Sequence, residues 1–569
     1  MANTTQGYPW LNQYPTGVAW DTPIPVAPAY ELLDTAVKKF ADRPFIDFYD
    51  KKLTYREGGN LVNRLAAGLQ KMGVQKGDRI GLFLPNCTYA VIAYFAILKA
   101  GAIVVNLNPL YVDREIVHHL SDAGLKTVFT LDMPMMLDKF DAVFGRTQLE
   151  RIIVCPLADI LPFPKNLLYP FVKRKDVAKW KTDDRHIGFK DVLASDGSTP
   201  LPVAINPLSD LAVLQYTGGT TGIAKGAMLT HANIFANAEQ SARWFTTAKE
   251  GREKMLGVIP LFHVFAMTVV MNIAIRLGSE IILLPKFELN EVMKTITRKR
   301  PTMFPAVPTI YSAIINYPKL ADFDVSSIRL CFSGGAPLPV EVKQKFEKLT
   351  GCTLIEGYGL SETSPVATGN PIVGENRTGS IGLPIPGTYI SIRSLEDPNV
   401  EMPIGERGEV CIKGPQVMAG YWNKPEETAK VMLAGGYLRT GDVGIMDADG
   451  YTAIVDRIKD MIICSGFNVY PRNVEEAIYL HPAVAEVIVA GVPDEYRGQT
   501  VKAYIVLKSG MELTEADLAV FLKDKLSPIE RPKLYEFRTS LPKTMVGKLS
   551  RKAILEEEAA RAAAKAEQV

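Results

Sequence analysis

The sequence predicts an α/β protein with more than one domain, and three observations lead to that prediction. The chain has 569 residues, which is enough for two or three domains with a large core. Residues 79–84, 88–100 and 102–107 have in turn the patterns of a strand, a helix and a strand, a succession typical of a parallel sheet. Near the C-terminus strands and helices alternate again, which predicts a smaller α+β unit. Its elements are expected at 473–480 (helix), 484–490 (strand), 502–507 (strand) and 515–525 (helix).

The composition excludes several classes of protein. Hydrophobic residues make up 47% of the chain and charged residues 22%, as in ordinary globular enzymes. The formal net charge is +2, so no general affinity for nucleic acid is expected. The six cysteines are scattered and form no C-x-x-C pair, which argues against a zinc site and fits a reducing, cytoplasmic location. Residues 1–20 are polar and rich in turn-forming residues, unlike a signal peptide.

Two apolar runs are candidates for buried helices. They span Thr88–Leu98 and Val264–Ile275, and each is ended by a basic residue shortly afterwards. Both are too short to cross a bilayer. We therefore expect them in the interior of the α/β domain.

The stretch from Leu214 to His231 reads L-Q-Y-T-G-G-T-T-G-I-A-K-G-A-M-L-T-H and predicts a phosphate-binding loop. Glycines let backbone N–H groups turn toward an anion, and hydroxyls and a lysine add further donors. A plain Gly/Thr surface loop is the alternative, but the lysine and the apolar flanks favour phosphate. The residues that would serve are Thr217, Gly218, Gly219, Thr220, Thr221, Gly222 and Lys225.

This loop is not a Walker A motif. That motif places a lysine directly after its last glycine and a helix behind the loop. Here two residues separate Gly222 from Lys225, and the loop joins an apolar strand at 211–216 to another at 226–229. A helix is expected only from His231, with Thr230 as its N-cap.

The pattern Y-T-G-G-T-T-G-x-x-K-G resembles the signature loop of the adenylate-forming superfamily, which comprises acyl-CoA synthetases, luciferase-like enzymes and nonribosomal adenylation domains. Further motifs similar to those of the family follow in the same order over nearly the whole chain. They are L-K-A-G-A-I-V-V-N-L-N-P-L-Y (98–111), E-G-Y-G-L-S-E-T (356–363), T-G-D (440–442), D-R-I-K-D (456–460), S-G-F-N-V-Y-P (465–471) and L-P-K-T-M-V-G-K-L-S-R (541–551). The first loop together with G-F-N-V-Y-P is most similar to bacterial long- or medium-chain fatty-acid–CoA ligases.

The resemblance implies a large N-terminal adenylation domain of several subdomains over 1–456 and a small mobile C-terminal lid over 457–569. Lys459 would be the hinge, and Lys548, in the last motif, the catalytic lysine. The other implied catalytic residues are Thr217, Lys225 and Glu362. An aromatic face such as that of Tyr358 suits adenine, and a hard carboxylate suits Mg²⁺.

The resemblance also implies a set of binding residues. ATP or AMP would contact Thr217, Gly218, Gly219, Thr220, Thr221, Gly222, Lys225, Gly334, Gly335, Ala336, Gly357, Tyr358, Gly359, Ser361, Glu362, Asp442, Arg457 and Lys548. Mg²⁺, bound with ATP, would be held by Thr221 and Glu362. Asp442 would accept hydrogen bonds from both ribose hydroxyls, since a carboxylate offers two acceptor oxygens.

The acyl substrate would be bordered by Phe262, His263, Met267 and Gly334, and CoA would pass Ser465, Gly466 and Phe467. The implied reaction joins a fatty acid to CoA with ATP and releases AMP and pyrophosphate, with long chains preferred over medium ones. Two alternatives stay open: a ligase for aryl or short acids, and a catalytically silent nucleotide-binding scaffold. A homodimer is one of the oligomeric states that the sequence leaves open.

The segment Leu157–Arg185 departs from the α/β pattern. It combines prolines and apolar residues with the basic cluster Lys173–Lys175. Exposed apolar side chains beside basic ones can lie on an anionic membrane surface. An insertion packed on the domain surface explains the pattern equally well, and both interpretations stand.

Overall fold

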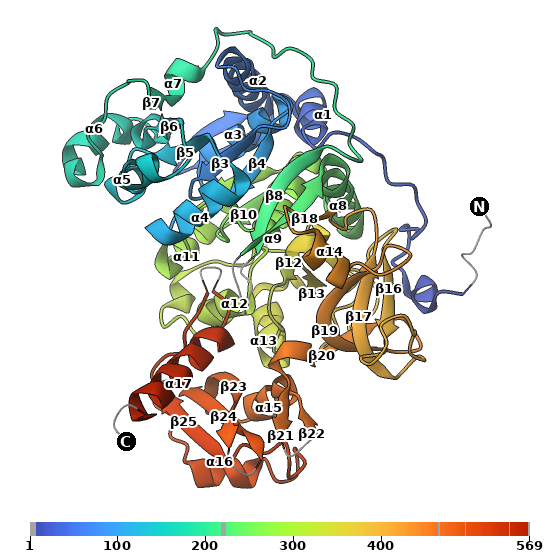
Figure 1. Ribbon diagram of the computed structural model, residues 1–569. Helices are drawn as coiled ribbons and strands as arrows, with labels where there is room; N and C mark the ends of the chain where they lie inside the picture. Colours follow the sequence, from blue (N-terminus) through green and yellow to red (C-terminus); the bar gives the residue numbers. More distant parts are fainter. Residues whose placement is uncertain (1–6, 218–223, 465–466, 495–496, 545–546, 567–569) are drawn as a thin grey trace.

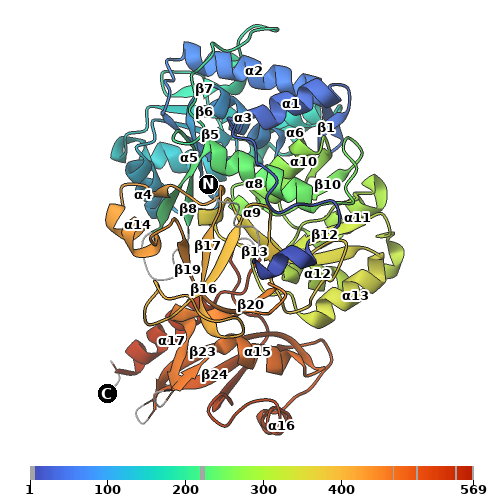
Figure 2. The same cartoon turned by 90° about the vertical axis from the view of Figure 1, so that its right-hand side faces the viewer.

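Two large hydrophobic cores and two small clusters of buried side chains lie within the described residues. The computed structural model describes residues 7–217, 224–464, 467–494, 497–544 and 547–566. One cluster of buried side chains extends from Trp10 to Tyr451, and a second from Ile462 to Leu526. Figures 1 and 2 show the corresponding bodies, a large N-terminal one and a small C-terminal one packed against one end of it.

An eight-stranded sheet lies at the centre of the N-terminal body. In order across the sheet, the strands are β18 (Gly420–Tyr421), β9 (Lys225–Thr230), β8 (Leu211–Thr217), β4 (Ile103–Asn106), β3 (Arg79–Phe83), β5 (Thr127–Leu131), β6 (Arg151–Cys155) and β7 (His186–Gly188). The six from β8 to β7 run parallel, which confirms the sheet type that the strand–helix–strand pattern predicts. Strands β9 and β18 are antiparallel to their neighbours.

Three four-stranded sheets complete the N-terminal body. The first contains β10 (Lys254–Gly257), β11 (Glu280–Leu283), β1 (Pro44–Phe48) and β2 (Lys51–Thr54). The second contains β12 (Leu330–Ser333), β13 (Thr353–Gly359), β14 (Val366–Gly369) and β15 (Leu383–Pro384). The third is antiparallel and contains β16 (Tyr389–Arg393), β17 (Arg407–Lys413), β19 (Leu438–Met446) and β20 (Thr452–Arg457).

Helices cover these sheets. Those of the N-terminal body are α1 (Glu31–Phe40), α2 (Tyr55–Lys71), α3 (Thr88–Lys99), α4 (Asp113–Ala123), α5 (Pro134–Val143), α6 (Lys165–Val172), α7 (Phe189–Val192), α8 (His231–Trp244), α9 (Val264–Ala266), α10 (Ile273–Arg276), α11 (Leu289–Lys299), α12 (Pro308–Ile315), α13 (Val340–Thr350) and α14 (Pro425–Val431). Both apolar runs form buried helices, as predicted: α3, and α9 with α10, which a π-helical stretch over Met267–Asn272 joins. Among the described residues, no helix is both long and apolar enough to cross a membrane.

The hairpin of β8 and β9 carries the predicted phosphate loop. Its last register pair is Thr217 opposite Lys225. The helix that follows begins as predicted: the Thr230 hydroxyl accepts a hydrogen bond from the Asn233 backbone N–H at 3.2 Å, and the Asn233 side chain accepts one from Thr230 N–H at 2.9 Å. This reciprocal cap fixes the direction of α8 beneath the hairpin.

The C-terminal body is the small α+β unit that the sequence predicts. Its elements are β21 (Ile462–Cys464), β22 (Phe467–Val469), α15 (Pro471–Tyr479), β23 (Val484–Asp494), β24 (Gly498–Leu507), α16 (Glu515–Phe521), β25 (Leu534–Arg538) and α17 (Arg551–Ala566). Helix α16 is shorter than the predicted 515–525. After Phe521 the chain tightens into turns whose hydrogen bonds span three residues, from Lys523 N–H to the Val520 carbonyl and from Lys525 N–H to the Leu522 carbonyl.

Candidate active site

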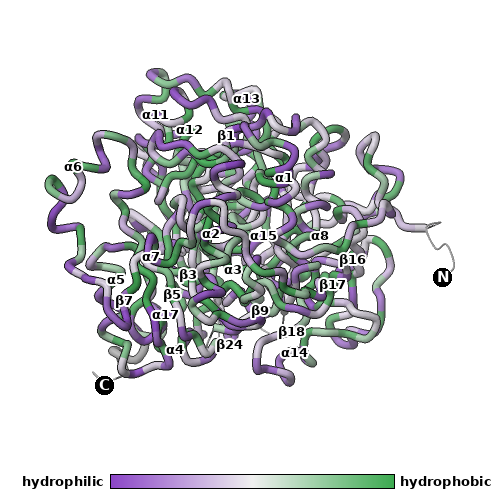
Figure 3. The backbone as a smooth tube through the Cα atoms, turned by 90° about the horizontal axis from the view of Figure 1, so that it is seen from above, coloured by the Kyte–Doolittle hydropathy of each residue, from purple (hydrophilic) through white to green (hydrophobic). Residues whose placement is uncertain are grey.

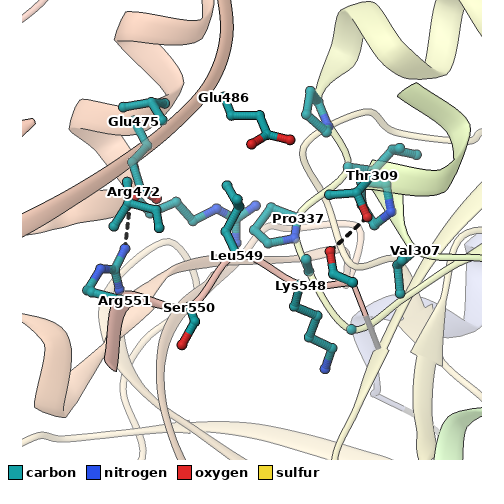
Figure 4. Close-up of a pocket in the computed structure, with 18 of the residues that line it drawn as sticks. Val307, Thr309, Pro337, Arg472, Glu475, Glu486, Lys548, Leu549, Ser550 and Arg551 are labelled. Atoms are coloured by element: carbon teal, nitrogen blue, oxygen red, sulfur yellow. Dashed lines mark hydrogen bonds and ion pairs between the residues drawn. The ribbon is translucent and has the colours of Figure 1, made fainter. Parts of the chain in front are cut away.

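A cavity of about 1700 Å³ lies between the two bodies. Strand ends and loops of the N-terminal body line one side, and the segment that leads into α17 lines the other (Figure 4). Eleven of the predicted site residues line this cavity. They are Phe262, His263, Gly335, Ala336, Gly357, Tyr358, Gly359, Asp442, Arg457, Lys459 and Lys548. Motifs that are up to about three hundred residues apart in the sequence therefore meet at one place.

Asp442 is a buried carboxylate that binds two polar side chains. It lies on β19 opposite Arg457 of β20, and its side chain is 2% exposed. The Tyr358 hydroxyl donates to Asp442 Oδ2 at 2.6 Å, and Arg457 Nε lies 3.0 Å from Oδ1. Burial and the adjacent Asp442 carboxylate raise the pKa of Tyr358, so the phenol stays protonated and donates. Three predicted adenosine-binding residues thus hold one another in position.

Lys548 reaches into the N-terminal body. A Cβ atom added to Gly335, whose φ is +82°, would lie 2.5 Å from Lys548 Cε, so the lysine stem packs directly on the bare backbone there. The Thr309 hydroxyl donates to the Gly547 carbonyl at 2.8 Å and holds the lysine segment from the other body (Figure 4). Burial, and next the Arg457 charge, lower the pKa of Lys548 to about 8.

Two other glycines of the predicted adenine motif have packing roles. A Cβ on Gly357 would lie 2.1 Å from the Phe332 ring, and one on Gly359 would lie 1.7 Å from the Pro365 carbonyl oxygen. Neither position admits a side chain unless the backbone moves. These glycines let β13 pack closely on its neighbours, which in turn positions Tyr358 between them.

His263, a predicted neighbour of the acyl substrate, lines the cavity as a neutral group. Burial, and next the positive charge of Lys548, lower the pKa of His263 to about 3, so the ring is uncharged at neutral pH. Behind it lies a buried polar chain: Asn106 Nδ2 donates to Gln215 Oε1 at 3.0 Å, and Gln215 Nε2 donates to the Phe262 carbonyl at 3.0 Å. Asn106 Nδ2 also lies 3.4 Å from the sulfur of Met267, the first residue of the π-helical stretch.

Lys225 and Glu362 belong to a second polar group, beside the phosphate hairpin. Lys225 Nζ forms an ion pair with Glu427 of α14 and lies 5.2 Å from the centre of the Tyr421 ring. The Tyr421 hydroxyl donates to Glu362 Oε1 at 2.8 Å. The predicted phosphate-binding lysine and the predicted magnesium carboxylate are thus connected through Tyr421.

Several predicted residues lie elsewhere. Ser361 is in the 3-10 turn Ser361–Thr363, and Gly334 packs near Phe265 behind the cavity wall. Gly218, Gly219, Thr220, Thr221, Gly222, Ser465, Gly466 and the side chain of Phe467 lie outside the described residues. In the parts of the chain that the structure describes, no group of three or more His, Cys, Asp or Glu side chains could hold a metal ion.

The predicted hinge lies where the two bodies meet. Lys459 is part of the 3-10 turn Ile458–Asp460, directly after β20. Arg551 bonds Asp460 Oδ2 at 2.8 Å and Glu475 Oε1 at 2.7 Å, so the start of α17 is tied to the turn. The hinge turn and the segment that carries Lys548 are therefore linked within the C-terminal body.

The structure also shows site residues that the sequence reasoning missed. Glu356 lines the cavity and accepts a hydrogen bond from Leu338 N–H at 3.2 Å, and burial raises the pKa of its carboxyl to about 7. Its position just before G-Y-G is the one signal that could have pointed to it. Thr309 and Glu427 stand in no recognisable motif, and only the fold brings them to the site.

Comparisons with known proteins agree with this geometry. Residues 33–422 match the model of the AMP-binding enzyme family, and residues 473–548 match the model of the AMP-binding enzyme C-terminal domain. The chain is 49% identical over 553 residues to a long-chain-fatty-acid–CoA ligase of Bacillus subtilis, with 97% of this chain and 98% of that protein covered. It is 40% identical over 560 residues to one of Yersinia pestis, with 96% and 98% covered.

A solved structure shows the same architecture. The crystal structure of ATP-bound MatB from Rhodopseudomonas palustris superposes with a TM-score of 0.81 at 29% sequence identity, and it covers 93% of this chain and 99% of that chain. Fold, motifs and both family models agree over nearly the entire length of the chain. We conclude that the chain belongs to the AMP-binding enzyme family of adenylate-forming proteins.

Proposed function

We propose that this protein is an AMP-forming fatty-acid–CoA ligase that prefers long chains to medium ones. In the first half-reaction the fatty carboxylate attacks the α-phosphate of ATP, an acyl–phosphate bond forms, and pyrophosphate leaves. In the second, the CoA thiol attacks the acyl carbon, the thioester forms, AMP leaves, and the thiol proton is lost. The observation that carries the proposal is the position of Lys548 on Gly335, in one cavity with His263, Tyr358 and Asp442.

The adenylation step needs charge stabilisation rather than a general base. A carboxylic acid is already ionised at pH 7, and the charge that develops is on phosphate oxygens. Lys548 would contact the α-phosphate and the acyl oxygen, and Lys225 with Thr217 would hold the outer phosphates. The buried group of Tyr358, Asp442 and Arg457 would orient the adenosine.

Glu362 is the described residue that fits a magnesium ion bound with ATP. One carboxylate with substrate phosphates is the arrangement typical of Mg²⁺ sites. Oε1 of Glu362 is held by the Tyr421 hydroxyl and so has a defined orientation. Thr221 is the second proposed ligand and lies outside the described residues. When bound, the ion would neutralise phosphate charge.

The acyl chain would lie on the apolar side of the cavity. Phe262 and the uncharged His263 border it, and Gly334 and Met267 lie behind them. A neutral ring suits an apolar tail, because a charged ring would need water or a counter-ion beside it. Curated relatives are named for long-chain acids, and this supports long chains over aryl or short acids.

The second half-reaction would follow a rotation of the C-terminal body about Lys459. One large core ends at Tyr451 and the next begins at Ile462, which supports a boundary between residues 456 and 457. A small cluster of Val443, Val455 and Tyr470 joins the two bodies at that boundary. Rotation would withdraw Lys548 and bring Ser465, Gly466 and Phe467 to the CoA arm. This rotation of the C-terminal body would break the hydrogen bond from the Thr309 hydroxyl to the Gly547 carbonyl.

We also propose a cytoplasmic enzyme, with a homodimer as its assembly, that touches the inner face of the membrane through α6. This helix has no buried side chain and projects from the margin of the molecule beyond the eight-stranded sheet (Figures 1 and 3). Phe163 is 79% exposed, Phe171 81% and Val172 74%. A lysine–arginine–lysine run follows at 173–175, and an anionic lipid surface is the partner that accepts exposed apolar and basic side chains together.

Vesicle sedimentation tests the membrane contact, and light scattering of the free protein tests the dimer. We expect salt-sensitive binding to vesicles that contain phosphatidylglycerol and none to phosphatidylcholine alone. Phe163→Ser with Phe171→Ser should abolish this binding. Leu480→Ser with Val520→Ser, which changes apolar side chains of the C-terminal body that are 66% and 61% exposed, should not. Equal binding by both double variants would contradict the assignment.

AMP release by the purified protein tests the proposed reaction. We expect CoA-dependent release that is greatest with long-chain acids across a panel from acetate to oleate, with coumarate included. If AMP release is greatest with aryl or short acids, the proposed substrate class is wrong but the proposed reaction stands. Binding of ATP without release for any acid would contradict the proposal and favour a silent scaffold.

A further inference from the structure

Helix α14 places an acidic side chain on the phosphate-binding lysine. Strand β18 pairs with β9, with Tyr421 opposite Ala227, and this brings the chain from 420 onward beside the phosphate hairpin. The Tyr421 backbone N–H donates to the Thr428 hydroxyl at 2.8 Å and fastens α14 to the strand. The carboxylate of Glu427 then meets Lys225 Nζ.

Glu427 has a second cation within its own helix. Its Oε1 accepts a hydrogen bond from Lys430 Nζ at 2.5 Å, while Oε2 pairs with Lys225. If Lys225 turns away, Glu427 therefore keeps one partner. The side chains of Lys225 and Glu427 are 36% and 31% exposed, so water screens this pair and it can open at small cost.

The contacts of the Lys225 ammonium come from the protein itself. The ammonium lies over the Tyr421 ring and against Glu427, and the Tyr421 hydroxyl occupies an oxygen of Glu362. Phosphate oxygens carry more charge than one carboxylate and would draw Lys225 away.

We propose that Glu427 is a positioning residue, an internal counter-ion that holds Lys225 until ATP arrives and takes it back when pyrophosphate leaves. The inference rests on the proposed function, because it requires that Lys225 binds phosphate. In this role Glu427 lowers the affinity of the site for ATP and for pyrophosphate, and it speeds the release of pyrophosphate. No bond of the substrates forms or breaks at Glu427.

The test compares Glu427→Gln with Glu426→Gln. Glu426 is the neighbouring acid in α14 and makes no hydrogen bond or ion pair with any residue that the structure describes. Its Gln variant removes the same charge from the protein and so serves as the control. For E427Q we expect the KM for ATP and the inhibition constant of pyrophosphate both to fall by about two- to fivefold, with E426Q close to wild type. Equal values for the two variants, or a higher KM for ATP in E427Q, would overturn the inference.

A double variant separates this inference from the proposed function. If Glu427 acts through Lys225, the effect of E427Q should disappear in a Lys225→Gln background. An effect that persists there would overturn the inference. If the wild-type protein shows no acid-dependent ATP–pyrophosphate exchange, the proposed function itself is overturned. If exchange is normal, K225Q weakens it and E427Q leaves it unchanged, only the counter-ion role of Glu427 is overturned.

Discussion

The adenosine end and the phosphate end of the proposed nucleotide site are held in different ways. At the first, Tyr358 and Arg457 engage both oxygens of Asp442, which is 2% exposed. At the second, Lys225 and Glu427 are each about one third exposed, and each member of the pair has another partner nearby. Arg457 is itself 48% exposed, but the Asp442 carboxylate is buried with both oxygens engaged, and such an acceptor keeps its geometry. An ion pair whose two members are both screened by water exchanges partners more easily.

The difference suggests a division of work. The adenosine end is already arranged before ATP binds, and so it can set orientation at little cost in ordering side chains. The phosphate end must accept a highly charged group and then release two products in turn. Exchangeable ion pairs suit that cycle, and variants at the two ends should therefore behave differently.

Asp442→Ala should have the largest effect among changes at the two ends. It removes the acceptor of Tyr358 and leaves Arg457 without its partner in the buried group. We expect kcat/KM for ATP in acid-dependent pyrophosphate exchange to fall by about 10²-fold or more. Unchanged thermal stability would assign the loss to the site, and a loss below tenfold would contradict a preformed adenosine end.

Tyr358→Phe is the sharper change at the same end. It keeps the aromatic face for adenine and deletes only the hydroxyl that donates to Asp442. Hydrogen bonds to charged groups are worth about 1.5–3 kcal/mol, so we expect kcat/KM for ATP to fall by roughly tenfold or more. Isothermal titration with AMP should show the same loss. An unchanged affinity would mean that Arg457 alone positions the carboxylate.

The smallest effect is expected in the pH profile. The pKa of Lys548 is lowered to about 8, so its ammonium form predominates below that pH and is lost as the pH rises through it. If the ammonium acts in adenylation, kcat/KM should decline above about pH 8. Lys548→Arg stays charged and should show lower activity without this decline. The same decline in both proteins would assign the titration to another group.

Local sequence patterns were sufficient for much of the fold. The threonine cap of α8 and the β8–β9 hairpin depend on residues close in sequence, and the structure confirms both. The parallel pairing of β3 with β4 follows from the strand–helix–strand pattern and is confirmed as well. Eleven of the site residues that the family resemblance predicts line one cavity.

The contacts between distant residues could not be predicted in this way. The pair of Lys225 and Glu427 joins positions 202 apart, and Glu427 stands in a charged helix that looks like any solvated surface. The hydrogen bond from Tyr358 to Asp442 spans 84 positions, although each residue alone carries a motif. The resemblance gives Gly357 and Gly359 only as nucleotide contacts, whereas the structure packs them against Phe332 and Pro365. Such roles depend on which elements the fold places together.

Separate measurement of the two half-reactions in Lys548→Ala tests the central claim most directly. Lys548 packs on Gly335 in the arrangement proposed for adenylation. We predict that ATP–pyrophosphate exchange falls by about 10²–10³-fold, while premade acyl-AMP and CoA still give acyl-CoA. Lys459→Pro, which stiffens the hinge turn, should do the reverse. An equal loss of both half-reactions in Lys548→Ala would contradict a lysine that serves adenylation and then withdraws.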